Sequence, residues 1–120
     1  MSDTPLGPVN RLAEALGHLA RTVDSRTQAA PDTSYTASLL AGGPLKCAKK
    51  AGEEGIEFAL AVAAEDDLAV AAEASDLLYH ALVALRSRSI ALDAVADQLI
   101  RRQGLSGLEE KAARTDQPKS

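Results

Sequence analysis

The sequence predicts an all-α fold, an antiparallel bundle of four to five helices that dimerisation completes. Apolar residues recur at intervals of three and four along most of the chain, which is the spacing of one helix face. No segment has the alternating β-branched pattern of a strand. Hydrophobic residues make up 46% of the 120 residues and aromatic residues only 2%. The core is therefore expected to be small and aliphatic, a condition that favours association with a second copy.

The first two helices are expected on either side of a polar loop. The first begins after Pro8 and shows apolar residues at helical spacing, namely Leu12, Leu16, Leu19 and Val23. Residues 24–33 are polar and predict a loop. Ser34 can then cap a short second helix that stops at Gly42 and Gly43.

Three longer helices are expected to follow. Pro44 suits the first turn of the third helix. The acidic stretch 65–67 is a short connection, so the third and fourth helices should be antiparallel neighbours, and Gly104 should end the fifth. Ala91 stands where a capping Ser or Asp would be expected before the fifth helix. The expected ranges are about 44–64, 68–86 and 92–102.

Length and composition set limits on the domain and its surroundings. Residues 1–103 are expected to form one domain, with 104–120 as a flexible tail, because a chain of this size suits one core and not two. The formal net charge of -4 argues against a nucleic-acid binder. The sequence has one cysteine, Cys47, and shows neither a basic and apolar leader nor a run of about 18 apolar residues. These features favour a cytoplasmic protein that does not enter membranes.

Ionisable side chains gather on one face of the third helix and one face of the fourth, when residues are placed at about 100° intervals. The set on the third helix is Lys46, Lys50, Glu53 and Glu57, with Glu54 at its margin. The set on the fourth is Glu73, Asp76 and His80. The rest of the fourth helix is chiefly Leu, Val and Ala, so it should be central.

Carboxylates on a central helix are costly unless a cation lies between them. The antiparallel turn would bring the acids of the two helices together, and oxygen ligands suit Mg²⁺, or Mn²⁺ in its place. The expected metal ligands are Glu53, Glu54, Glu57, Glu73 and Asp76. Bound Mg²⁺ implies a phosphate substrate, because it keeps open positions for phosphate oxygens and can activate water.

Lysines precede these acids by one to two helical turns. Lys46, Lys49 and Lys50 could hold the phosphates of such a substrate. A carboxylate not fully engaged by metal, Glu54 or Glu57, could orient or deprotonate the attacking water.

The acids also carry a resemblance to a known family. Glu53-Glu54-Gly55-Ile56-Glu57, followed after fifteen residues by Glu73-Ala74-Ser75-Asp76, resembles the E-E-x-x-E…E-x-x-D signature of the all-α, MazG-like nucleotide pyrophosphohydrolases. Within that superfamily, residues 34–40, 50–57 and 73–80 resemble the phosphoribosyl-ATP pyrophosphatases of histidine biosynthesis, over about residues 12–102. The resemblance implies Mg²⁺-dependent hydrolysis of 1-(5-phosphoribosyl)-ATP to 1-(5-phosphoribosyl)-AMP and pyrophosphate by a stand-alone helical homodimer.

Several interpretations stay open at this point. The charges of the third helix alone could be a solvated face. Tyr35, Thr36 and His80 are candidate nucleotide contacts. Tyr35 and Thr36 could equally contact a dimer partner or only begin the second helix, and His80 fits a hydrogen-bonded, partly buried histidine better than a ligand. Contacts to the phosphoribosyl group could come from an arginine, and the candidates are Arg21, Arg26, Arg86 and Arg88. The alternatives for the whole chain are a housecleaning hydrolase of nucleoside triphosphates and a non-catalytic helical scaffold.

Overall fold

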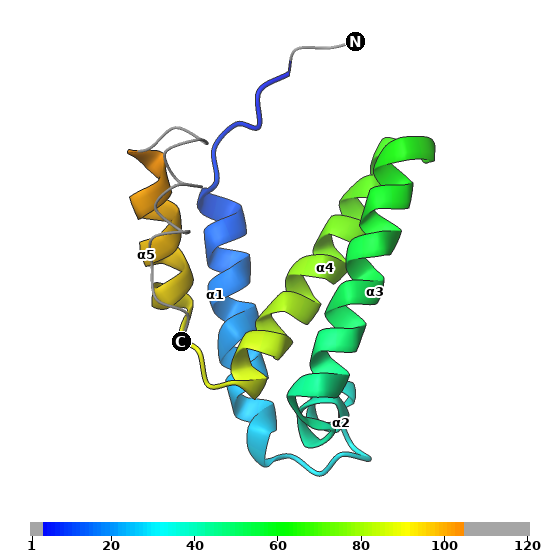
Figure 1. Ribbon diagram of the computed structural model, residues 1–120, viewed down its shortest axis with the longest axis vertical. Helices are drawn as coiled ribbons and strands as arrows, with labels where there is room; N and C mark the ends of the chain where they lie inside the picture. Colours follow the sequence, from blue (N-terminus) through cyan, green and yellow to red (C-terminus); the bar gives the residue numbers. More distant parts are fainter. Residues whose placement is uncertain (1–3, 105–120) are drawn as a thin grey trace, which may run out of the picture. The chain divides into compact units, whose positions relative to one another are not determined.

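The computed structural model describes residues 4–104 of the chain (Figure 1). Its elements are α1 (Asn10–Ser25), the 3-10 helix η1 (Arg26–Gln28), α2 (Tyr35–Ala41), α3 (Gly43–Ala64), α4 (Asp67–Ser87) and α5 (Leu92–Gln103). No strand occurs between residues 4 and 104, so the all-α prediction is confirmed. Completion by a second copy stays a prediction.

Contacts divide the chain into two compact units, residues 1–89 and residues 90–120. The first unit holds α1 to α4 and every candidate site residue named above. The described part of the second unit is α5, which ends at Gly104 as predicted. The predicted tail from residue 105 onward lies outside the described residues, and the single domain over residues 1–103 stays a prediction.

Side-chain caps mark the starts of α2 and α4. The Ser34 hydroxyl accepts a hydrogen bond from the Ala37 amide at 3.2 Å, and the Asp66 carboxylate accepts one from the Ala69 amide at 2.9 Å. Helices α1, α3 and α5 begin without such a bond, α5 directly after Ala91. The predicted starts are confirmed to within a residue or two for capped and uncapped helices alike.

The loop predicted over residues 24–33 is wrong in its first half, because α1 continues to Ser25 and η1 follows it. The side chains explain the difference. Hydroxyls donate hydrogen bonds to backbone carbonyls of the preceding turn, from Ser25 to Thr22 at 2.7 Å and from Thr27 to Asp24 at 2.8 Å. Such bonds replace contacts with water, so polar residues can remain in helical conformation here.

The core of the first unit joins all four of its α-helices. Its buried members come one from each helix: Val23, Leu39, Cys47 and Val83. Cys47 is 1% exposed and donates a hydrogen bond from Sγ to the Leu39 carbonyl at 3.2 Å. The cysteine is therefore a small buried residue that ties α3 to α2.

Helix α4 is the element that α1, α2 and α3 all contact. Its buried residues, His80, Leu82 and Val83, all lie in its C-terminal half. In the N-terminal half, Leu68 is 82% exposed. The prediction of a central helix is thus correct for the C-terminal half and wrong for the N-terminal half of a single chain, because the core that joins the four helices involves only the C-terminal half.

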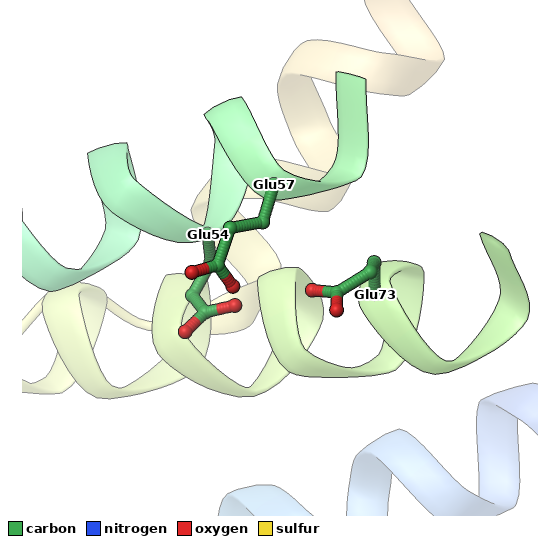
Figure 2. Close-up of side chains that lie close together, drawn as sticks. All are labelled: Glu54, Glu57 and Glu73. Carbon is green, nitrogen blue, oxygen red and sulfur yellow. The ribbon is translucent and has the colours of Figure 1, made fainter. Parts of the chain in front are cut away.

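By length and composition alone, α4 could cross a membrane. Its contacts offer another explanation of that composition. One end of the helix is packed against three other helices, and Glu73 near the other end turns toward acids of α3 (Figure 2). A helix shared by three neighbours is expected to be rich in Leu, Val and Ala.

Candidate metal centre

Three carboxylates meet where α3 and α4 lie side by side. Glu54 and Glu57 on α3 and Glu73 on α4 each offer an oxygen, and these oxygens all lie within 4.8 Å of one another. Figure 2 shows the three side chains extending into the space between the two helices. The separation of three residues places Glu54 and Glu57 on one face of α3. The antiparallel turn then returns α4 so that Glu73 faces them.

This acidic cluster, Glu54, Glu57 and Glu73, is electrostatically unfavourable without a cation. Burial raises the pKa of Glu54, and the neighbouring carboxyls of Glu57, Asp76 and Glu73 raise it further. Burial also raises the pKa of Glu73, and the charges of Glu57 and Asp76 add to the effect. One oxygen each of Glu54 and Glu73, Oε2, is shielded from solvent without a hydrogen-bond donor among the described residues. Unpaired buried acceptors that repel one another fit a hard divalent cation.

The two other expected metal ligands lie outside the acidic cluster. Glu53 forms an ion pair with Lys50 on its own helix, at 3.4 Å between Nζ and Oε2. Asp76 is exposed, although its charge contributes to the raised pKa of Glu54 and Glu73. The structure therefore brings together three of the five expected ligands and leaves Glu53 and Asp76 beside them.

The expected phosphate-binding lysines precede the cluster on α3. Lys46 and Lys49 are exposed, whereas Lys50 is half-buried and pairs with Glu53. The positive charge of Lys50 also lowers the pKa of His80. Of the three lysines, Lys50 is the one that interacts with residues beside the acidic cluster, Glu53 and His80. Phosphate binding by all three lysines stays a prediction.

His80 lies between the acidic cluster and a group of rings. Its side chain is buried, and Nε2 is 3.8 Å from Oε1 of Glu54, too long for a hydrogen bond. Burial lowers the pKa of His80, and the charge of Asp76 opposes this effect without cancelling it. The imidazole is therefore neutral near pH 7 and does not supply a cation to the cluster.

The rings form a second structural feature beside His80. Tyr35 of α2 stacks against Tyr79 of α4 with ring centres 6.4 Å apart, and the rings of Tyr79 and His80 meet edge to face at 4.9 Å. The hydroxyls of Thr36 and Tyr79 are hydrogen-bonded at 2.6 Å. Tyr35 remains 56% exposed. We call Tyr35, Tyr79 and His80 the aromatic group; its exposed part offers a flat surface of the kind on which a nucleotide base stacks.

The structure thus brings the candidate nucleotide contacts Tyr35, Thr36 and His80 into one place, next to the acids. It adds Tyr79, which the sequence analysis did not single out as a site residue. A signal for Tyr79 was available in the sequence, because it adjoins His80 on a helix with few other polar side chains.

Open space adjoins the acids on α3. At both Gly52 and Gly55, an added Cβ atom would meet nothing within 4 Å. These two glycines are therefore not required by packing within the chain. They leave the surface next to Glu54 free for a ligand.

The raised pKa values predict how the stability of the metal-free protein depends on pH. A carboxyl whose folded pKa lies above its ordinary value of 4.5 binds more protons in the folded state, so the free energy of unfolding falls as pH rises from 4.5 through the folded pKa. Replacing Glu73 with Gln removes one such group. The stability of Glu73→Gln relative to wild type, measured by urea unfolding in EDTA, should therefore increase between about pH 4.5 and about pH 8. A difference that stays constant across this range would contradict the proposed repulsion.

Comparisons with known proteins agree on one family. The family described as "Phosphoribosyl-ATP pyrophosphohydrolase" matches residues 16–103, which include the acidic cluster and the aromatic group. A protein of Ruegeria sp. (strain TM1040) named phosphoribosyl-ATP pyrophosphatase is 52% identical over 99 residues, 82% of this chain and 94% of the relative. A protein of the same name from Caulobacter sp. (strain K31) is 48% identical over 106 residues, 88% of this chain and 98% of the relative. A third, from Rhodobacter capsulatus, is 49% identical over 100 residues, 83% of this chain and 97% of the relative.

Proposed function

Because this chain belongs to the phosphoribosyl-ATP pyrophosphohydrolase family, we propose that it hydrolyses 1-(5-phosphoribosyl)-ATP to 1-(5-phosphoribosyl)-AMP and pyrophosphate, the second step of histidine biosynthesis. The observation that carries the proposal is the acidic cluster of Glu54, Glu57 and Glu73 inside the matched region. Phosphoric anhydride hydrolysis needs a centre that neutralises phosphate charge, and a group of carboxylates can do so only through bound cations.

The cation we propose is Mg²⁺, with Mn²⁺ as a substitute. The donor set fits it, because buried and unpartnered carboxylate oxygens without thiolate or neutral imidazole ligands suit a hard ion. Glu54, Glu57 and Glu73 would hold it, and Glu53 and Asp76 are proposed as further ligands. When bound, the ion supplies charge neutralisation at the phosphates and lowers the pKa of water.

The remaining roles fall to side chains of α3. Burial and the neighbouring carboxyls raise the pKa of Glu54, and a raised pKa makes a carboxylate a stronger base. Glu54, or Glu57 beside it, is therefore the proposed general base that takes a proton from the attacking water. Lys46, Lys49 and Lys50 hold the leaving pyrophosphate as point charges.

We further propose a homodimer that works in the cytoplasm without nucleic acid or membrane partners. In a single chain, large apolar side chains of α3 and of the N-terminal half of α4 remain exposed, with Ile56 at 64%, Leu60 at 61% and Leu68 at 82%. Exposed apolar residues at this density indicate an interaction surface. A second copy would bury them and complete the bundle.

The proposal is tested by pyrophosphate release from phosphoribosyl-ATP and, in parallel, from ATP and dUTP. We expect release with Mg²⁺ from phosphoribosyl-ATP and little from the free triphosphates. Comparable release from ATP or dUTP would instead identify a housecleaning hydrolase. No release from any of the three would leave a non-catalytic helical scaffold as the function. The dimer is tested separately, by measuring the mass of the purified chain in solution by light scattering.

A further inference from the structure

A cavity lies at the C-terminal end of α4, whereas Glu73 of the acidic cluster lies in the N-terminal half of that helix. Its volume is about 260 Å³, smaller than the pockets that hold drug-sized ligands. Three segments of the first unit line it: η1, α2 and the C-terminal end of α4 with the residues after it. The lining that bears on ligand chemistry is Thr27, Arg86, Ser87 and Ser89. We call this cavity the arginine pocket.

Arg86 is held in place at the arginine pocket. Asp24 of α1 lies 3.2 Å from Nε of the guanidinium, and Nη1 contacts the Ser89 hydroxyl at 3.5 Å. The ion pair and this long contact keep the guanidinium beside the pocket, and Nε is shielded from solvent without a hydrogen-bond partner among the described residues. A fixed and planar donor set of this kind is suited to phosphate.

Ser89 lies at the same end of α4. It has a φ of 55°, in the left-handed region, and among residues 4–104 it is the one residue other than glycine with positive φ. It follows the C-cap residue Arg88, and its amide donates a hydrogen bond to the Arg86 carbonyl at 2.9 Å, which is a common way for a helix to end. This turn brings the Ser89 hydroxyl to 3.5 Å from Nη1 of Arg86.

The order of chemical groups along α4 is informative. Glu73 of the acidic cluster comes first, His80 of the aromatic group follows about 10 Å further along the helix axis, and Arg86 follows after about 9 Å more. Helix α2 lies along the second interval, since Thr36 contacts Tyr79 while Ala37, Leu40 and Ala41 line the arginine pocket. Along the axis of α4, a centre for phosphate chemistry is thus followed by rings and then by a cation, with Arg86 turned toward Asp24 of α1.

We propose that the arginine pocket binds the phosphate of the phosphoribosyl group, at the end of the substrate remote from the triphosphate. This inference rests on the proposed function, because it assigns the three features to the three parts of phosphoribosyl-ATP. The triphosphate lies at the acidic cluster, the purine at the aromatic group and the terminal sugar phosphate at Arg86. The pocket is therefore what separates phosphoribosyl-ATP from ATP, which lacks that group.

The test compares Arg86→Gln with wild type on two ligands. We expect kcat/KM for phosphoribosyl-ATP to fall about 10- to 100-fold, the range for losing a charge-assisted hydrogen bond. The inhibition constant of ATP, measured in competition with phosphoribosyl-ATP, should stay within about twofold of the wild-type value, because ATP does not reach the arginine pocket. Equal losses for both ligands, or no loss for either, would overturn the proposal.

Two further variants test whether the effect of Arg86→Gln comes from lost phosphate binding, from a change in overall charge or from a change in the fold. Arg88→Gln removes the same charge two residues away, and Arg88 is exposed and outside the pocket lining. Arg88→Gln should lower kcat/KM for phosphoribosyl-ATP far less than Arg86→Gln does. An equal loss would mean that long-range charge, not the pocket, is responsible. Asp24→Asn removes the ion pair with Arg86 but keeps the guanidinium. Because Asp24 orients the guanidinium, Asp24→Asn should lower kcat/KM for phosphoribosyl-ATP by less than Arg86→Gln does. An equal loss in Asp24→Asn, accompanied by an equal loss of stability to urea, would mean that the ion pair matters only for the fold, and the proposal would fail.

A binding measurement makes the inference independent of catalysis. Ribose 5-phosphate, titrated into ¹⁵N-labelled protein, should shift the backbone amide signals of Thr27, Ser87 and Ser89 in wild type and not in Arg86→Gln. Shifts confined to α3 near the acidic cluster would overturn the proposal. If wild type bound ribose 5-phosphate at the arginine pocket but did not hydrolyse phosphoribosyl-ATP, the proposed function would be wrong while the phosphate site would still be supported.

Discussion

Replacing Glu73 with Gln is expected to lower kcat/KM for phosphoribosyl-ATP by about 10³-fold or more. Glu73 is the member of the acidic cluster that α4 contributes, and the amide keeps its size while removing its charge. A cation centre contributes several kcal/mol to stabilising a phosphoryl-transfer transition state, and each 1.36 kcal/mol is a factor of ten in rate. Pyrophosphate release at saturating and limiting substrate measures the loss.

The control for this prediction is Asp67→Asn on the same helix. Asp67 is an exposed acid in the first turn of α4, outside the acidic cluster. It should keep nearly all activity. Because Glu73→Gln also relieves repulsion, its metal-free form should unfold at a higher urea concentration than wild type. An inactive variant that is also less stable would indicate damage to the fold and count against the assigned role.

The helices could be predicted from the sequence because their ends depend on local chemistry. Ser34, Asp66 and Gly104 act within one turn of their own positions, and such effects are visible in a few consecutive residues. The hydroxyl groups of Ser25 and Thr27 also act on their own turn of the chain, but the sequence does not show whether they favour a helix or a loop. They favour a loop when they bond to water and a helix when they bond back to carbonyls, and only the folded chain decides between these.

The candidate site could be predicted in its composition but not in its arrangement. Helical angles place Glu53 at the centre of the acidic face of α3 and Glu54 at its margin. The structure reverses this order, because α4 packs on the side where Glu54 lies and Glu53 pairs with Lys50. The sequence analysis names Arg86 among four candidate arginines, but it could not single Arg86 out or predict the pocket around it. The residues of the pocket come from η1, from α2 and from the end of α4, and a pattern along one helix does not show how these segments pack together.

Removing divalent cations is expected to abolish pyrophosphate release, with a loss of at least about 10³-fold in EDTA and recovery on adding Mg²⁺ or Mn²⁺. The physical reason is the state of the carboxylates. Burial and mutual repulsion raise the pKa of Glu54 and Glu73, so the charged forms of these groups are disfavoured when no cation lies between them. Activity retained in EDTA would contradict a metal centre at this site.

A second measurement separates binding at the acidic cluster from other effects of metal. Mg²⁺ should raise the melting temperature of wild type, because a ligand that binds only the folded state stabilises it. The shift should be absent in Glu73→Gln and present in Asp67→Asn and Arg86→Gln, since Asp67 and Arg86 lie outside the cluster. Metal binding should also release protons from Glu54 and Glu73, so the shift should be smaller at about pH 5 than at about pH 8. A shift of equal size in Glu73→Gln would place the cation elsewhere and would contradict metal binding at the acidic cluster.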